Sequence, residues 1–373
     1  MAEVQVRTSG GEYTVFIGHR LYEGELVGWL RRASPGKAVV VSHPSIWELH
    51  GRRVQEAIRG LPVSAAEPLR FLFPEGEGNK NLRNLEEGYR ALLRGGVTRE
   101  DVILALGGGV VGDLAGFLAA SYLRGIRYLQ LPTTLMAMVD SSIGGKVGVD
   151  LPGAKNAVGA FYQPQAVLSD VDVLRTLPEG ELRSGLAEVA KYGFLYDGGL
   201  LQEIEGWPGG LPGEGEALGG LVARCARHKA RVVEVDERDE SGTRALLNYG
   251  HTFGHALESA AGYGALRHGE AVALGMIAAA RASEICGLAS GGLFALHCRV
   301  LRPILGGMEL PPGLDLRRVL GDMQTVTKRG RELRFVLLEE PQAPRLVESL
   351  PAEVVERALR ETWEELRGAG GCR

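Results

Sequence analysis

The segment VILALGGGVVGDLAGF, residues 102–117, points most directly to the fold of this chain. Its first residues, 102–106, are all apolar and indicate a buried strand, and the glycines after them lead into a helix-like run. Such a strand–turn–helix unit is typical of a parallel sheet that binds a phosphate group at the helix N-terminus. The glycines at 107, 109 and 112 match GxGxxG, which favours a dinucleotide in a non-standard position along the chain.

Strand-like and helix-like segments alternate on both sides of this unit. The alternation predicts an α/β N-terminal domain, residues 1–177, with a mostly parallel, doubly wound, Rossmann-like sheet. The predicted elements are an edge hairpin over 4–17, further strands at 38–41, 70–73 and 128–131, and helices at 21–32, 46–59 and 82–93.

The pattern changes after residue 177. Helical periodicity dominates from 181 to 301, and it is followed by a short hairpin of 333–338 with 345–347 and a last helix over 352–367. We therefore expect a second domain, residues 178–373, that is mainly α-helical and carries the metal and substrate residues.

Composition limits the classes of function. A chain of 373 residues suggests two domains, and the net charge of −4 argues against general nucleic-acid binding. We find no signal-peptide pattern at the N-terminus and no apolar run long enough for a membrane span. The four cysteines are scattered and have no CxxC spacing, which favours free thiols and a cytoplasmic protein.

Histidines in the second half suggest a metal site. His251 and His255 are four residues apart on a predicted helix, so both lie on one face, where they could share a metal or divide ligand and acid/base roles. His268 opens another helix-like run, and Glu188 on a third could complete a His/His/Glu zinc site with an open position. A lone histidine pair at this spacing more often only packs, so the interpretation depends on nearby cations.

Several cations accompany these residues. Lys146 and Lys155 lie in loop-like segments beside small residues, and Lys191 shares a helix face with Glu188. Lys229 belongs to the helix that precedes the histidine helix, and we expect Arg244 and Asn248 on the face of the histidine helix itself. A single lysine is usually a solvated surface charge, but together these residues indicate a pocket for a polyanion that carries phosphate and carboxylate.

Six segments in order resemble 3-dehydroquinate synthases: GGGVVGDLAGF from 107, PTTLMAMVDSSIGGKVG from 132, KNAVGAFYQP from 155, AEVAKYG from 187, LNYGHTFGHALE from 247 and HGEAVALGM from 268. The resemblance implies conversion of 3-deoxy-D-arabino-heptulosonate 7-phosphate to 3-dehydroquinate and phosphate, in the shikimate route. It also implies recycled NAD, a divalent metal (usually zinc, with cobalt as the alternative), and a homodimer.

The resemblance also implies roles for individual residues. The metal ligands would be Glu188, His251 and His268, and His255 would be the acid/base group. The residues that contact or position the substrate would be Asp140, Lys146, Lys155, Asn156, Lys191, Lys229, Arg244, Asn248 and Lys328, with Arg124 reaching the substrate phosphate across a dimer interface. The NAD contacts would be Glu77, Lys80, Gly108, Gly109, Val110, Asp113, Thr133, Thr134, Asp140, Ser141, Lys146, Lys155 and Thr176.

Three segments depart from the family pattern. Where the family usually has an acidic residue that contacts the adenosine ribose, this chain has Val41-Ser42-His43-Pro44. The Asp-Lys-Lys near the family's C-terminus becomes Val326-Thr327-Lys328. An extra residue in the segment 236–240 leaves either Asp239 or Glu240 as the family's loop carboxylate.

Other functions share parts of this pattern. Another sugar phosphate cyclase, of the deoxy-inosose or valiolone type, would have the same metal ligands, but such relatives tend to differ in the loop DSSIGGK, 140–146. A metal-dependent dehydrogenase of the glycerol type would leave the lysines unexplained. A non-catalytic phosphometabolite-binding protein would need no histidine pair beside a carboxylate.

Overall fold

The computed structural model describes residues 1–59, 68–212, 217–262, 265–308, 314–328 and 333–368. The chain forms two compact units, one of Met1–Pro178 with Glu216–Arg238 and one of Glu179–Gly215 with Asp239–Arg373. The first change of unit falls next to the boundary expected at residue 177. In addition, the helix α7 (Ala217–Val235) belongs to the first unit, where it packs against β1 (Ala2–Thr8) and β2 (Gly11–Gly18).

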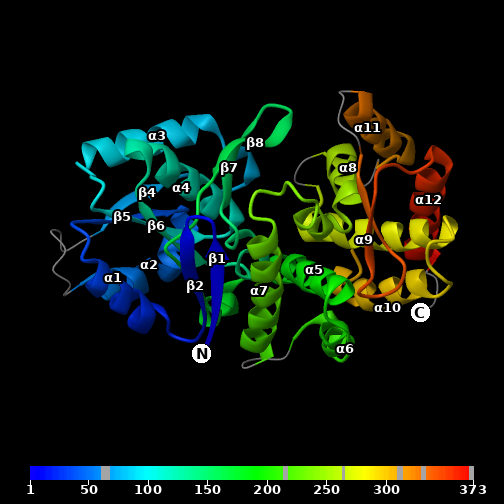
Figure 1. Ribbon diagram of the computed structural model, residues 1–373, viewed down its shortest axis with the longest axis horizontal. Coiled ribbons are helices and arrows are strands. Elements are labelled where there is room, and N and C mark those ends of the chain that lie inside the picture. Colours follow the sequence, from blue (N-terminus) through cyan, green and yellow to red (C-terminus); the bar gives the residue numbers. More distant parts are fainter. Residues whose placement is uncertain (60–67, 213–216, 263–264, 309–313, 329–332, 369–373) are drawn as a thin grey trace. The chain divides into compact units, whose positions relative to one another are not determined.

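The first unit is built on a seven-stranded sheet of order β1-β2-β9-β6-β5-β3-β4. Figure 1 labels β1, β2, β4, β5 and β6 of this sheet. Only β1 and β2 pair antiparallel, and the other neighbours are parallel, which confirms the predicted α/β class. The remaining strands of this sheet are β3 (Ala38–Ser42), β4 (Leu69–Leu72), β5 (Val102–Gly107), β6 (Arg127–Pro132) and β9 (Ala166–Asp170). The helices of the unit besides α7 are α1 (Val27–Ala33), α2 (Pro44–Ile58), α3 (Leu82–Arg94) and α4 (Gly109–Ser121).

The central strands form because they are apolar along their whole length. Every residue of β3 and β5 is buried, as expected for parallel strands that are covered on both faces. Alternate residues such as Val39 and Ile103 join one core cluster with Leu114 and Leu118 of α4. The sheet therefore provides a rigid base for the turn between β5 and α4.

The path of the chain sets a switch point in this sheet. From β3 the chain passes to β4 at one edge, and it then returns to β5 on the other side of β3. The connections thus diverge between β3 and β5. In open α/β sheets, ligands bind at the carboxyl ends of strands at such a point.

A second sheet in this unit was not predicted. The strands β7 (Lys146–Leu151) and β8 (Ala154–Phe161) pair antiparallel over residues that we expected to be loop-like. Close backbone approach explains the small residues here, because a Cβ on Gly148 would lie 2.6 Å from the carbonyl oxygen of Val158. Lys146 and Lys155 therefore stand on a hairpin.

The second unit is mainly helical, as predicted. Its helices are α5 (Glu179–Leu195), α6 (Gly198–Glu205), α8 (His251–Ala261), α9 (His268–Ile285), α10 (Leu293–Leu305), α11 (Leu316–Lys328) and α12 (Ala352–Gly368). The predicted hairpin is present as β10 (Phe335–Leu338) and β11 (Pro344–Val347). The helix α9 is almost wholly buried and contacts α5, α8, α10 and α12.

Two further features concern a buried histidine and the cysteines, which were expected to be free thiols. His297 is a core residue: it is fully buried, its Nδ1 donates to the Leu293 oxygen at 2.8 Å, its Nε2 accepts from the Tyr249 hydroxyl at 2.7 Å, and its ring stacks on Phe194. The described cysteines, Cys225, Cys286 and Cys298, are free thiols, and Cys372 lies outside the described residues. Within the described part of the chain, no helix combines the length and apolar character needed to cross a bilayer.

Candidate functional site

The second unit contains a buried carboxylate. Glu188 projects from α5 and is 1% exposed. Lys191, three residues later on the same helix face and also 1% exposed, forms an ion pair with Glu188 Oε2. The pair neutralises the lysine charge and leaves Oε1 directed toward two histidines.

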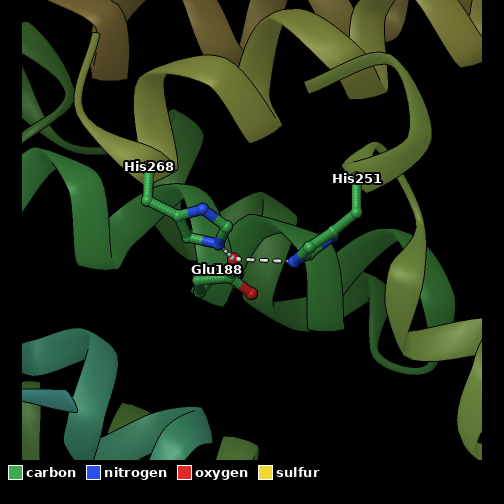
Figure 2. A group of neighbouring side chains, drawn as sticks. All are labelled: Glu188, His251 and His268. Carbon is green, nitrogen blue, oxygen red and sulfur yellow. Dashed lines mark ion pairs between the residues drawn. The ribbon is translucent and has the colours of Figure 1, made fainter. Parts of the chain in front are cut away.

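The two histidines come from different helices. Glu188 Oε1 lies 3.7 Å from Nε2 of His251, the first residue of α8, and 3.6 Å from Nε2 of His268, the first residue of α9. Figure 2 shows both imidazoles turned toward the carboxylate, His268 from the upper left and His251 from the right. The structure thus brings together the three residues that the sequence singled out as metal ligands.

The spacing of these donor atoms fits a single zinc-like ion. Bonds of about 2.1 Å in a tetrahedral zinc site place the ligand atoms about 3.4 Å apart. The measured separations from Glu188 Oε1, 3.6 and 3.7 Å, are close to that value. Two imidazoles and one carboxylate also leave a fourth position for substrate, which is typical of a catalytic zinc site rather than a structural one.

The other nitrogen of each imidazole has a partner that orients the ring. His268 Nδ1 lies 3.3 Å from Glu258 Oε1, and His251 Nδ1 lies 3.2 Å from the carbonyl oxygen of Tyr249. Burial opposes protonation of His268, but Glu188 and Glu258 outweigh burial and raise its pKa to about 9. Burial and the Lys191 charge lower the pKa of His251 to about 3.

His255 lies beside this cluster. Its ring centroid is 5.5 Å from that of His251 and 6.0 Å from that of His268. It also belongs to a second possible donor group with Glu258 and His268, and its side chain is exposed. An exposed imidazole beside an ion site is suited to exchange protons with a bound substrate.

One expectation about the histidine helix is wrong. Arg244 and Asn248 do not lie on α8 but on a separate 3-10 turn, η7 (Arg244–Asn248). Gly250 ends this turn with φ of +82°, a left-handed conformation that suits glycine, and α8 begins at the next residue. Arg244 is nevertheless buried, at 3% exposed, within the second unit.

The glycine turn of the first unit has the features of a nucleotide site. Gly108 precedes α4 without any side-chain cap, and a Cβ there would lie 3.0 Å from Thr134 Cγ2. A Cβ on Gly109 would lie 3.1 Å from Ser141 Oγ. The hydroxyl oxygens of Thr133 and Ser141 are buried without a hydrogen-bond partner among the described residues. Uncapped helix N–H groups and unpaired hydroxyls fit a pyrophosphate and ribose of NAD.

A buried lysine joins several predicted NAD and substrate residues. Lys80, 3% exposed, lies 2.8 Å from Glu77 Oε1, donates to Asn156 Oδ1 at 2.8 Å and lies 3.3 Å from Asp113 Oδ2. Burial raises the pKa of Asp113 to about 6 in spite of the Lys80 charge. Asn156 is also fixed through its backbone, since its N–H donates to Asp150 Oδ1 at 2.6 Å. The contacts attach the β7–β8 hairpin to the sheet unit.

The remaining predicted residues of the first unit occupy separate positions. Asp140, in the short π-helix η4 (Ala137–Ser141), forms an ion pair with Lys229 of α7. Thr176 ends η5 (Val171–Thr176), where its hydroxyl contacts His50 Nε2 at 2.9 Å. Arg124 is exposed on η3 (Tyr122–Arg124). Val110 lies in the first turn of α4. In the second unit, Lys328 ends α11, and its side chain lies outside the described residues.

Sequence reasoning missed two supporting carboxylates. Glu258, which contacts His268, is seven residues after His251 and therefore on the same face of α8, a spacing that could have identified it. Asp150 fixes the backbone of Asn156 and lies 3.8 Å from Lys80 Nζ, a contact that no local spacing predicts.

Comparisons with known proteins agree with this geometry. The family descriptions "3-dehydroquinate synthase N-terminal" and "3-dehydroquinate synthase C-terminal" match residues 70–184 and 185–329. The 3-dehydroquinate synthase of Bordetella pertussis is 43% identical over 372 residues, which cover 98% of this chain and 99% of that relative.

Two solved structures have the same fold. A 2-deoxy-scyllo-inosose synthase complexed with carbaglucose-6-phosphate, NAD+ and Co2+ has a TM-score of 0.85 at 23% identity, covering 96% of this chain and 99% of that one. The 2-epi-5-epi-valiolone synthase of Streptomyces hygroscopicus subsp. jinggangensis, with NAD+ and Zn2+ bound, has a TM-score of 0.81 at 25% identity, covering 95% and 97%.

The contact of Glu258 with His268 generates a prediction. Replacing Glu258 by Gln keeps its size but removes the charge that orients the imidazole, so we expect zinc to bind about 10–100-fold more weakly. The measurement is competition for zinc against a chelator of known affinity. The matched control is Glu270→Gln, since Glu270 lies on α9 near His268 but contacts Arg267. Equal zinc affinity in both variants would contradict the role of Glu258.

Proposed function

The chain belongs to the 3-dehydroquinate synthase family, and we propose that it converts 3-deoxy-D-arabino-heptulosonate 7-phosphate to 3-dehydroquinate and phosphate. The observation that carries this proposal is the convergence of Glu188, His251 and His268, in a chain that is similar to a named synthase along 98% of its length. Identity to that synthase, 43%, exceeds the 23% and 25% identity to the two cyclases of other substrates.

The proposal assigns the cofactors to separate units. Glu188, His251 and His268 hold a divalent ion, and the turn around Gly108 with the hydroxyls of Thr133 and Ser141 holds NAD. When bound, NAD would supply the means to accept and return a hydride, and the ion would supply a Lewis acid for substrate oxygen atoms.

The chain's own residues bind, orient and move protons. Lys191 pairs with the Glu188 carboxylate through Oε2, which leaves Oε1 facing the two histidines. His255 exchanges a proton at its exposed imidazole. The cationic and amide residues fix the phosphate and carboxylate of the substrate by charge-assisted hydrogen bonds: Lys146, Lys155, Lys191, Lys229, Arg244, Asn156 and Asn248.

Several contacts within the protein hold these side chains in place before the substrate binds. Lys229 neutralises Asp140, and Lys80 holds the side-chain oxygen of Asn156. Because side chains that are already fixed lose little freedom on binding, their contribution to catalysis is mainly orientation and electrostatics. The departing phosphate can accept a proton itself, so we assign no further base from the protein.

The proposed reaction has a direct test. Purified protein incubated with the heptulosonate phosphate, NAD and zinc should release phosphate and 3-dehydroquinate in equal amounts, with no net NADH. The variant Glu188→Gln, which keeps the size of the side chain, should release neither. Turnover of another phosphorylated sugar in place of this one would favour a different cyclase, and net NADH from glycerol would favour a dehydrogenase.

We also propose a homodimer in which Arg124 serves the neighbouring subunit. Arg124 is exposed, and it follows Leu123 in a pair of left-handed residues with φ of 65° and 51°. Such conformations are costly for residues other than glycine and are kept where the surroundings or a function require them. The carbonyl oxygen of Leu123 accepts two hydrogen bonds from Arg99, which holds this turn in place.

Mixing two inactive variants tests this arrangement. Arg124→Ala and His251→Ala subunits, each inactive alone, should regain about a quarter of wild-type activity when mixed equally, because half the dimers contain one intact site. Formation of mixed dimers is checked by native mass spectrometry. Mixed dimers without recovered activity would contradict a role for Arg124 in the neighbouring site.

A further inference from the structure

The inference concerns the carboxyl end of β3, and it rests on the proposed binding of NAD at the glycine turn. Ser42 pairs with Leu106 in the parallel register of β3 and β5, so both strands end at the same edge, next to Gly107. This edge is the switch point of the sheet. In the Rossmann dinucleotide-binding fold, the strand next to the one that leads into the glycine turn ends in an acidic residue, which accepts a hydrogen bond from the 2′-hydroxyl of the NAD ribose.

The residue after β3 in this chain is His43, and its ring is held firmly. Its Nδ1 lies 2.9 Å from the carbonyl oxygen of Phe73, and its ring meets the Phe73 ring edge-on with centroids 4.5 Å apart. The strand end is fixed as well, since Ser42 Oγ donates to the Leu106 oxygen at 2.7 Å and Phe73 N donates to the Ser42 oxygen at 3.1 Å. His43 is 8% exposed.

These contacts define the chemical form of the imidazole. A carbonyl oxygen can only accept, so Nδ1 carries the hydrogen and Nε2 presents a lone pair when the ring is neutral. Burial lowers the pKa of His43, which keeps the ring neutral at pH 7. No hydrogen bond of Nε2 to the described residues is present, so this nitrogen is available as an acceptor.

A neutral acceptor has a different effect from a carboxylate at this place. A carboxylate selects NAD in two ways: it accepts from the 2′-hydroxyl and it repels a 2′-phosphate. A neutral imidazole retains the first effect and lacks the second. The acidic charge that acts on His43 comes from Glu75, an exposed side chain in the segment after β4, where water screens its charge.

We propose that His43 determines the nucleotide specificity of this chain by accepting a hydrogen bond from the ribose 2′-hydroxyl without excluding a 2′-phosphate. The full-length, zinc-loaded protein therefore binds NAD and NADP with dissociation constants within about tenfold of each other. The catalytic reaction is unaffected in kind, because the 2′ position is remote from the nicotinamide that exchanges the hydride.

Calorimetric titration of NAD and NADP into the wild type, His43→Asp and His43→Asn tests the proposal. Both substitutions place a preferred N-cap residue before α2, so both should fold, and they differ only in charge. We expect His43→Asp to weaken NADP binding about tenfold or more relative to NAD, and His43→Asn to keep the wild-type ratio. Leu49→Asp adds the same charge at an exposed position of α2 and should leave the ratio unchanged.

The outcomes separate this inference from the proposed function. A wild type that binds NAD more than about a hundredfold tighter than NADP would overturn the inference and leave the proposed function intact. Equal changes in the ratio of the NAD and NADP dissociation constants in His43→Asp and His43→Asn would also overturn the inference and leave the proposed function intact. If neither dinucleotide binds, the proposed function fails, and the inference fails with it.

Discussion

The buried carboxylate of Glu188 is the constraint on which the second unit depends. A carboxylate that is 1% exposed is costly unless it is paired, and here its two oxygens face Lys191 on one side and two histidines on the other. Meeting this requirement brings α5, α8 and α9 close together. The approach is possible because a Cβ on Gly269 would overlap the backbone of Ser184 on α5, and one on Gly254 would lie 2.9 Å from the Ala271 oxygen on α9.

In the first unit a buried cation is likewise paired with groups of opposite charge. Lys80 is surrounded by carboxylate and amide oxygens from the segment before α3, from α4 and from the β7–β8 hairpin. Its charge therefore connects the nucleotide turn to the hairpin that carries Lys146 and Lys155. In both units a buried ion pair positions side chains of the candidate site. The same interactions therefore stabilise the fold and fix the geometry of the site.

Local spacing predicted the parts of the site that lie within one element. The sequence was sufficient for the mostly parallel sheet, for the helical second unit and for the shared face of Glu188 and Lys191. It failed where distant contacts decide the structure: the β7–β8 hairpin forms over segments in which small and polar residues interrupt the apolar ones, and α7 joins the first unit through β1 and β2. The sequence pattern also predicted a single helix that carries Arg244, Asn248 and the histidines. In the structure Gly250 interrupts it, so Arg244 and Asn248 lie on a separate turn.

The central claim is that three side chains from three helices hold one divalent ion. X-ray absorption at the zinc edge of the zinc-loaded protein measures this directly. The account predicts nitrogen and oxygen ligands at about 2.0–2.2 Å, with the outer-shell scattering of two imidazoles, and the loss of one imidazole in His268→Ala. Sulfur ligands at about 2.3 Å, or a spectrum that His268→Ala leaves unchanged, would contradict it.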